Sequence, residues 1–369
     1  MTAIHFACPL DCFDACGLVA DVEAGRVVRI RGDAAHPYTR GKVCIKGKGL
    51  LKRQYHPHRL TRPLMRVAGE LRAATLEEAL DVLAARLEEI RMRGDTRAVL
   101  HYADCGHEGL SKKVDEILFN CYGGVTVPTG SLCWGAGIAA QNFDFGLARS
   151  HAPQDIARSR CILIWGRNPA ATGPHLLPFI RQARDKGARV ILIDPLKTVT
   201  AGLADTHLAI RPGTDGALAL GMAHLLVKWG LADEEWLEAH ALGWRPFVAS
   251  LDRYTPRWAA EETGLLAEDI EALARAYGET KPAAIILGIG LQRYTNGGST
   301  VRCIDALAAL TGNIGRSGGG VSYANRHTSP WISGLIQASG VHDVNVRTFP
   351  LPKLAAALSD LRDPPIEMA

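Results

Sequence analysis

The sequence predicts an α/β protein in which a small, cysteine-bearing N-terminal domain precedes domains built on doubly wound parallel sheets. Three observations support this fold class. Between residues 161 and 311, short apolar runs alternate with loops and helical patterns, as in units whose strands lie parallel in one sheet. Four of the nine cysteines lie in the first 44 residues, ahead of this alternation. The length of 369 residues suits two or three domains.

Composition and charge exclude several classes of protein. Apolar residues make up 47% and charged residues 22% of the chain, which is typical of a globular protein with ample core-forming material. The net charge of +4 is too small for this length to indicate nucleic-acid binding. No apolar run reaches the length of about 18 residues that a transmembrane helix needs. The first residues contain neither an apolar export segment nor a twin-arginine pair, so we expect a cytoplasmic protein without a transmembrane helix.

The first four cysteines have the spacing of an iron–sulfur site. Cys8, Cys12 and Cys16 fall within nine residues, and Cys44 follows much later. Iron–sulfur clusters require four thiolates on convergent backbone, which a three-plus-one arrangement provides. Structural zinc sites usually take two pairs of ligands, and unrelated core thiols are a third interpretation. An odd number of cysteines in a chain without an export signal disfavours disulfides.

Residues 1–60 are expected to form the cluster domain. Two alternating stretches within residues 18–31 flank Ala24 and Gly25, which is the signal of a β-hairpin. The hairpin would carry the chain away from the first three cysteines and back toward Cys44.

Residues 61–150 are expected to form the first part of an α/β domain. Thr75 and Glu78 form a capping-box pattern at the start of a strongly amphipathic helix, and Gly94 follows its end. The predicted elements are a helix over 75–93, a strand over 99–102, a helix over 109–121 and a strand over 125–128. Their alternation indicates α/β layers.

Residues 151–325 carry the clearest strand–loop–helix pattern and are expected to form a Rossmann-like domain. The predicted strands cover 161–165, 188–194, 207–210 and 283–288, and the predicted helices cover about 174–186, 215–229 and 298–311. Ligands of such sheets bind at the carboxyl ends of strands. The polar residues expected there are Asn168, Asp194, Asp215 and Gln292.

Residues 326–369 are expected to return toward the preceding domain. They should contain one helix within 335–362, and a strand should begin at Ile366.

The cysteine segments also resemble a known family. CPLDCFDACGL, followed by TRGKVCIKGKG, resembles the N-terminus of the molybdopterin bis-guanine-dinucleotide oxidoreductases of the dimethyl-sulfoxide-reductase superfamily. The resemblance continues in order through WGRNP, IDP, RPGTDGALAL and LTGNIGRSGGG. It implies a [4Fe–4S] cluster on the four cysteines and a molybdenum or tungsten bis(molybdopterin guanine dinucleotide). In the family, a lysine two residues after the last cluster cysteine relays electrons to the pterin. Lys46 matches it, and a solvated surface lysine is the alternative.

The same resemblance assigns roles to residues at the strand ends. In the family, the aspartate of the RPGTD segment accepts hydrogen bonds from guanine, which points to Asp215, for which the alternative is a helix N-cap. Asp194 would accept from a ribose hydroxyl. The residues expected to complete the site are Gly166, Asn168, Gly213 and Thr214.

The loop over residues 288–298 superficially suggests phosphate binding. It lacks the GK[ST] sequence of a phosphate-binding loop, so we expect it to line the cofactor, with Gln292 and Asn296 as polar contacts.

The segment GSLCWGAG, residues 130–137, resembles the family segment that supplies a metal ligand. Cys133 stands at the ligand position, and a soft thiolate suits molybdenum or tungsten. A buried free cysteine is the alternative. Formate dehydrogenases of the family place a histidine after this ligand, whereas Trp134 follows it here, which disfavours formate oxidation. His107 and Glu108 could face the pocket, although solvated loop residues are the favoured interpretation.

The family also predicts what the chain would do. An oxidoreductase would transfer an oxygen atom, a sulfur atom or a hydride on a small-molecule substrate and exchange electrons with a ferredoxin-like protein or iron–sulfur subunit. Complete members are about twice as long, so the C-terminal half and barrel domain are expected to be absent and turnover by this chain alone to be slow. The alternatives are an electron-relay subunit like that of respiratory complex I and a non-redox hydratase.

Overall fold

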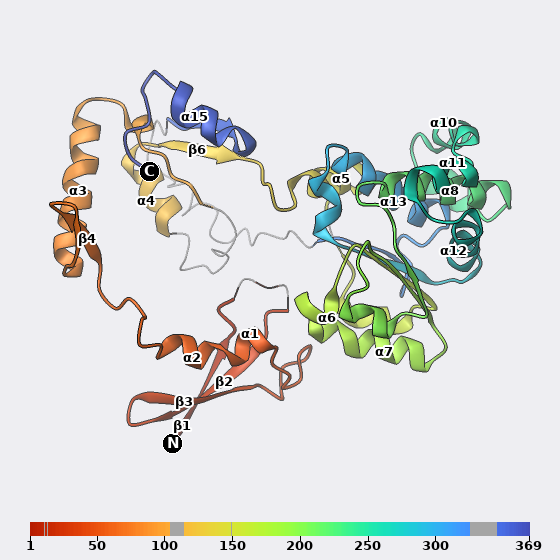
Figure 1. The fold of residues 1–369 in the computed structure, drawn as a ribbon, viewed down its shortest axis with the longest axis horizontal. Helices are drawn as coiled ribbons and strands as arrows, with labels where there is room; N and C mark the ends of the chain where they lie inside the picture. The colour runs from red at the N-terminus through yellow and green to blue at the C-terminus, as the bar shows by residue number, and fades with distance from the viewer. Residues whose placement is uncertain (11, 13, 104–113, 149, 325–344) are drawn as a thin grey trace. The chain divides into compact units, whose positions relative to one another are not determined.

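The computed structural model describes residues 1–10, 12, 14–103, 114–148, 150–324 and 345–369. The chain divides into two compact units, one formed by residues 1–131 with 328–369 and the other by residues 132–327 (Figure 1). The division into four domains stays a prediction, as do the roles of His107 and Glu108, which lie outside the described residues. No helix in the described ranges combines the length and apolar character needed to cross a membrane.

The first unit begins with a three-stranded antiparallel sheet. Its strands are β1 (Thr2–Ala7), β2 (Gly17–Glu23) and β3 (Arg26–Gly32), in the order β1-β2-β3. The predicted hairpin is therefore confirmed. Its turn residues Ala24 and Gly25 have positive φ angles of 47° and 75°, which a tight two-residue hairpin turn requires. β1 was not predicted from the sequence.

Helical and hairpin segments follow Cys44. The elements are α1 (Ile45–Lys48), α2 (Leu50–Gln54), β4 (Leu64–Val67), β5 (Glu70–Ala73) and α3 (Leu76–Met92). The capping box of α3 is confirmed, since the amide of Glu78 donates to Oγ1 of Thr75 at 3.1 Å and the amide of Thr75 donates to Oε2 of Glu78 at 2.7 Å. The β4–β5 hairpin was not predicted.

The rest of this unit contains short helices and one pair of parallel strands. The elements are the short 3-10 helix η1 (Thr96–Ala98), α4 (Val114–Tyr122), β6 (Thr126–Thr129), β12 (Arg347–Pro350), η9 (Leu351–Lys353) and α15 (Leu354–Asp360). β12 lies parallel to β6. The strand predicted over 99–102 forms only isolated parallel bridges, from Val99 to Met368 and from Leu100 to Thr126.

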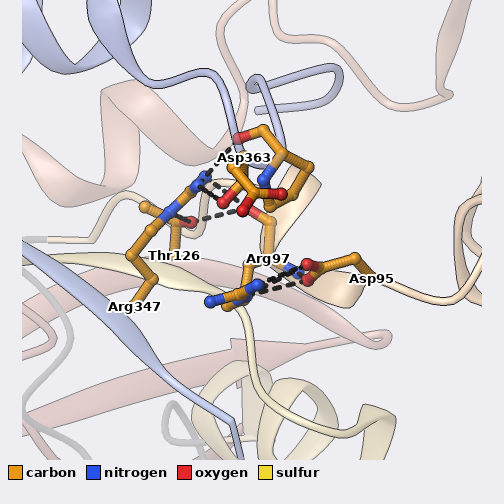
Figure 2. Close-up of polar contacts among 6 residues, drawn as sticks. Asp95, Arg97, Thr126, Arg347 and Asp363 are labelled. Carbon is orange, nitrogen blue, oxygen red and sulfur yellow. Dashed lines mark hydrogen bonds and ion pairs between the residues drawn. The ribbon is translucent and has the colours of Figure 1, made fainter.

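The side chain of Arg347 holds three separate segments of this unit together (Figure 2). Its Nε donates to Oγ1 of Thr126 at 2.9 Å, and a terminal nitrogen donates to the carbonyl of Arg97 at 2.8 Å. The other terminal nitrogen donates to the carbonyls of Asp363 at 3.1 Å and Pro364 at 2.7 Å. A guanidinium group carries five N–H donors, so it can bind several carbonyl oxygens that lie around it.

Replacing Arg347 by methionine is expected to loosen this unit. The change leaves the carbonyl groups without their charged donor, which should cost about 2–4 kcal/mol. The amide of Leu100 donates to the carbonyl of Met368 at 2.7 Å and reports on the same junction. Its hydrogen exchange should accelerate about 30-fold or more. The matched control is Arg362→Met, because Arg362 is exposed, and equal exchange rates in the two variants would contradict the role given to Arg347.

The second unit is built on one five-stranded sheet. Its strands are β7 (Cys161–Trp165), β8 (Arg189–Ile193), β9 (Thr206–Leu208), β10 (Ala283–Leu287) and β11 (Gly320–Ser322). The order is β11-β10-β7-β8-β9, and each neighbouring pair is parallel. The chain runs outward from β7 to β9, returns to β10 beside β7 and ends at β11. This is a doubly wound sheet with its switch point between β7 and β10.

Helices cover both faces of this sheet (Figure 1). Ile162 and Ile164 of β7 are fully buried on one face, while Leu163 and Trp165 belong to the core of the other face. Figure 1 shows α6 and α7 on one side and α8, α12 and α13 on the other. The helices of the unit are α5 (Gly135–Phe145), η3 (Pro153–Arg158), α6 (Pro169–Thr172), η4 (Pro174–Leu176), α7 (Leu177–Asp185), η5 (Val199–Leu203), α8 (Asp215–Lys228), α9 (Glu234–His240), α10 (Trp244–Ala249), η6 (Leu251–Arg253), α11 (Pro256–Thr263), α12 (Ala267–Glu279), η7 (Ile289–Arg293) and α13 (Gly297–Leu310).

Candidate cluster and cofactor sites

The structure brings the four N-terminal cysteines into one neighbourhood. The amide of Cys8 donates to the carbonyl of Cys16 at 2.8 Å, which closes the loop that carries the first three thiols. Burial raises the pKa of Cys16 to about 12, and the negative charges of Asp14, Cys8, Cys12 and Cys44 act in the same direction. Within the described ranges, no group of three His, Cys, Asp or Glu side chains has the geometry that a single metal ion requires.

Close backbone contacts return the chain to Cys44. The amide of Asp33 donates to the carbonyl of Gly17 at 2.9 Å, and the amide of Gly41 donates to the carbonyl of Asp33 at 2.8 Å. A Cβ on Gly32 would lie 2.2 Å from the carbonyl oxygen of Gly41, so only glycine fits there. These contacts place the loop before Cys44 beside the end of the predicted hairpin.

Lys46 lies in α1 and is exposed. Burial is the main cause that raises the pKa of Cys12, and the ammonium of Lys46 opposes it. Lys46 therefore acts on the charge of Cys12, and its relay role stays a prediction.

The loops at the sheet's switch point are in direct contact. Gly166 follows β7 with a φ angle of +58°, and Gly288 follows β10. A Cβ on Gly288 would lie 1.7 Å from the carbonyl oxygen of Gly166, so a side chain at position 288 would collide with backbone. The amide of Gly166 donates to the carbonyl of Ile193 at 2.7 Å, which ties the β7 loop to the end of β8 as well.

Asn168 and Asp194 lie in these strand-end loops. The amide oxygen of Asn168 accepts from the hydroxyl of buried Thr200 at 2.6 Å, which fixes the orientation of its side chain. The carboxylate of Asp194 accepts from the amide of Leu196 at 2.9 Å. Both side chains are half-buried.

Asp215 is the first residue of α8 and is only 5% exposed. Nε1 of Trp165 donates to its Oδ1 at 2.8 Å. Burial raises the pKa of Asp215, and the negative charge of Asp194 acts in the same direction. Thr214 occupies the N-cap position, and its hydroxyl donates to the carbonyl of Arg211 at 2.7 Å. The structure thus brings Asp194, Thr214 and Asp215 to one edge of the sheet.

Gly213 shapes the same loop. It has a φ angle of +84°, and a Cβ there would lie 3.1 Å from the ring of Tyr294.

Cys133 precedes α5 and is half-buried. The side-chain amide of Gln292 contacts the loop that carries Cys133, and its Nε2 donates to the carbonyl of Cys133 at 3.0 Å. Asn296 is exposed at the start of α13, where its carbonyl accepts from the amide of Thr300 at 2.9 Å. The cofactor-contact roles of Gln292 and Asn296 stay predictions.

Three residues of these sites were not predicted from the sequence. Trp165 orients Asp215, Thr200 orients Asn168, and Tyr323 donates to the carbonyl of Trp134 at 3.4 Å. Trp165 carried a usable signal, because an indole N–H in an otherwise aliphatic buried strand needs a polar partner. Thr200 and Tyr323 carried none, since their partners lie 32 and 189 residues away in sequence.

These features define an α/β protein with a thiol-rich loop and with glycine and aspartate residues at the carboxyl edge of its parallel sheet. Comparison with family models assigns residues 59–360 to the family described as molybdopterin oxidoreductase and residues 1–56 to the molybdopterin oxidoreductase Fe4S4 domain. The chain belongs to the molybdopterin oxidoreductase family, with its Fe4S4 domain at the N-terminus.

The chain is also similar to individual curated proteins. The chain is 38% identical to probable oxidoreductase YyaE of Bacillus subtilis, with 100% of the chain and 55% of that protein covered. It is 32% identical to F420-dependent formate dehydrogenase subunit alpha of Methanocaldococcus jannaschii, with 86% of the chain and 47% of that protein covered. The chain spans about half the length of these curated relatives.

A solved structure shares the fold. Acetylene hydratase from Pelobacter acetylenicus superposes with a TM-score of 0.72 at 24% identity, covering 85% of this chain and 44% of that one.

The chemistry of the described residues fits the groups that the family name implies. Four neighbouring thiols suit a [4Fe–4S] cluster. At the sheet edge, contacting glycine loops allow a bound pterin cofactor to approach the backbone closely, and the carboxylates of Asp194 and Asp215 offer hydrogen-bond acceptors.

Proposed function

We propose that this chain supplies the N-terminal half of a molybdenum- or tungsten-pterin oxidoreductase. The observation that carries the proposal is the presence, on one chain, of four cysteines whose charges act on one another and of a doubly wound sheet whose strand-end loops carry Asp194 and the buried Asp215. Cys8, Cys12, Cys16 and Cys44 would bind the [4Fe–4S] cluster. Lys46 would lie on the electron route between the cluster and the pterin.

The sheet edge would hold one guanine dinucleotide. Asp215 would accept from the guanine base, and its bond from Trp165 keeps the carboxylate aimed at one place. Asp194 would accept from a ribose hydroxyl. Asn168 is held by Thr200 and would offer its amide to the same nucleotide. Glycine at positions 166, 213 and 288 allows the backbone to approach it.

Cys133 would ligate the metal. When bound, the metal–pterin group supplies two-electron redox chemistry, while this chain holds and orients it and conducts electrons. The substrate is a small molecule that gains or loses an oxygen atom, a sulfur atom or a hydride. The relative from Methanocaldococcus jannaschii is named a formate dehydrogenase, but Trp134 follows Cys133 here, which disfavours formate. A ferredoxin-like protein or iron–sulfur subunit would exchange the electrons, in the cytoplasm.

Metal analysis of the native protein, purified without oxygen with whatever chains accompany it, tests this function. The proposal expects iron together with molybdenum or tungsten, and turnover that depends on a viologen dye. Iron without molybdenum or tungsten would contradict it and favour an electron-relay subunit. Molybdenum or tungsten with dye-independent turnover would contradict the redox role and favour a hydratase.

A further inference from the structure

Gln292 lies in η7, between the end of β10 and the start of α13, and only 6% of it is exposed. A buried amide must satisfy two donors and a carbonyl acceptor. All the hydrogen bonds that the structure records for its side chain lead to residues 132–137, which end the loop before α5 and begin that helix.

Four hydrogen bonds connect this amide to residues 132–137. Oε1 accepts from the amides of Ala136 at 2.7 Å and Gly137 at 3.3 Å. Nε2 donates to the carbonyls of Leu132 at 3.3 Å and Cys133 at 3.0 Å. Both donors and both acceptor positions of the side chain are thus used on one stretch of backbone.

The first amides of a helix have no partner within the helix. In α5 the N-cap residue, Trp134, makes no side-chain capping bond. Gln292 therefore caps α5 from another element, while its Nε2 holds the two residues that precede the cap.

Close packing fixes Gln292 itself. A Cβ on Gly297 would lie 2.1 Å from the carbonyl oxygen of Gln292, so α13 begins directly against its backbone. The neighbouring Leu291 lies 3.0 Å from the point where a Cβ of Gly166 would stand. Gln292 is thus anchored at the switch point of the sheet, where the dinucleotide is proposed to bind.

We infer that Gln292 is a positioning residue: its amide sets the backbone of residues 132–137, and so the direction of the Cys133 thiol, relative to the switch point. The geometry uses both the donors and the acceptor of the amide on residues 132–137. The catalytic meaning of this inference rests on the proposed role of Cys133 as metal ligand, but the positioning itself does not.

Two variants distinguish the contribution of the amide oxygen of Gln292 from that of its amide nitrogen. Gln292→Met keeps the length and removes all four bonds. Gln292→Glu keeps the acceptors for Ala136 and Gly137 and removes the donors to Leu132 and Cys133. The matched control is Gln154→Met, since Gln154 is exposed.

The experiment measures hydrogen exchange of the Ala136 and Gly137 amides and the rate at which iodoacetamide alkylates Cys133, read by mass spectrometry of its peptide. Gln292→Met should accelerate exchange at both amides about fivefold or more and change the alkylation rate. Gln292→Glu should leave exchange slow but still change alkylation by severalfold. Slow hydrogen exchange in β10 shows that the fold is intact. A variant in which β10 exchanges rapidly is not used, and the other variant then decides the test.

Exchange and alkylation within twofold of the control in both variants would overturn the inference. So would a Gln292→Glu variant that accelerates exchange as much as Gln292→Met, because that result would indicate general loosening. Neither readout needs molybdenum or tungsten. If Cys133→Ala leaves the paramagnetic resonance spectrum of the metal in the native protein unchanged, the ligand role fails while the positioning result stands.

Discussion

Replacing Asp215 by asparagine is expected to abolish the preference of the second unit for guanine over adenine nucleotides. Guanine presents two adjacent donors, N1–H and the exocyclic amine, and a carboxylate can accept from both. Asparagine offers one acceptor and sets a donor against the other group. A bidentate contact of this kind is worth about 1–3 kcal/mol of discrimination, so binding of guanosine diphosphate should weaken about 5- to 150-fold.

Isothermal titration with guanosine diphosphate and adenosine diphosphate measures this effect. Asp194→Asn is the comparison, because loss of a ribose contact should weaken both nucleotides alike. Since burial raises the pKa of Asp215, binding of guanosine diphosphate should also fall at a higher pH than an exposed aspartate would give, as the carboxylate takes up its proton. Equal binding of guanosine diphosphate by Asp215→Asn and the unmodified chain would contradict the assignment.

Replacing Asp305 by asparagine is expected to stabilise the second unit at neutral pH. Asp305 is 1% exposed, in α13, and Nε2 of Gln141 donates to its Oδ1 at 2.9 Å. Burial raises its pKa to about 8, aided by the charge of Asp144 and opposed by the Gln141 bond and Arg302. Among the described residues, Oδ2 of Asp305 and Oε1 of Gln141 are buried without a hydrogen-bond partner. An asparagine amide can accept from Gln141 and also donate to it.

The pH dependence of this effect has a definite sign. The pKa of an aspartate in the unfolded chain is about 3.9, below the value of about 8 in the folded unit. Between these values the unfolded chain releases a proton that the folded unit keeps, so stability falls as the pH rises from about 4 to about 8. Below about pH 4 the buried aspartate does not lower the free energy of unfolding, and above about pH 8 its destabilising effect is fully present.

Urea unfolding at several pH values checks this prediction. Asp305→Asn should raise the free energy of unfolding at pH 7 by about 2–4 kcal/mol and flatten its pH dependence across this window. Asp252→Asn is the control, because Asp252 is exposed, and it should change stability by less than about 0.5 kcal/mol. A destabilised Asp305→Asn variant with an unchanged pH profile would show that the buried carboxyl is not protonated.

The central sheet was predictable because its strands are buried on both faces and therefore appear as continuous apolar runs. The strand predicted over 161–165 coincides with β7, and Asp215 begins α8 where the pattern placed it. The elements that were missed are short or mostly exposed, such as β1 and the β4–β5 hairpin. Their alternation is weak because little of either face is buried.

Long-range polar pairing was not predictable. The bonds between Gln292 and the Cys133 loop join residues about 155–160 positions apart, and Arg347 reaches Arg97 across 250 positions. No local period or spacing encodes such contacts. The candidate site could therefore be predicted as a set of strand-end residues, whereas the residues that orient them required the structure.

The proposed electron route starts at the cluster, so the proposed function stands or falls with the metal that the four cysteines bind. The measurement is electron paramagnetic resonance of the chain, purified without oxygen and reduced with dithionite, together with iron and acid-labile sulfide analysis. We expect about four irons and one paramagnetic cluster per chain, lost in Cys16→Ala and retained in Cys121→Ala, since Cys121 is an exposed thiol outside the loop. One zinc per chain, without iron and without a paramagnetic signal, would contradict it.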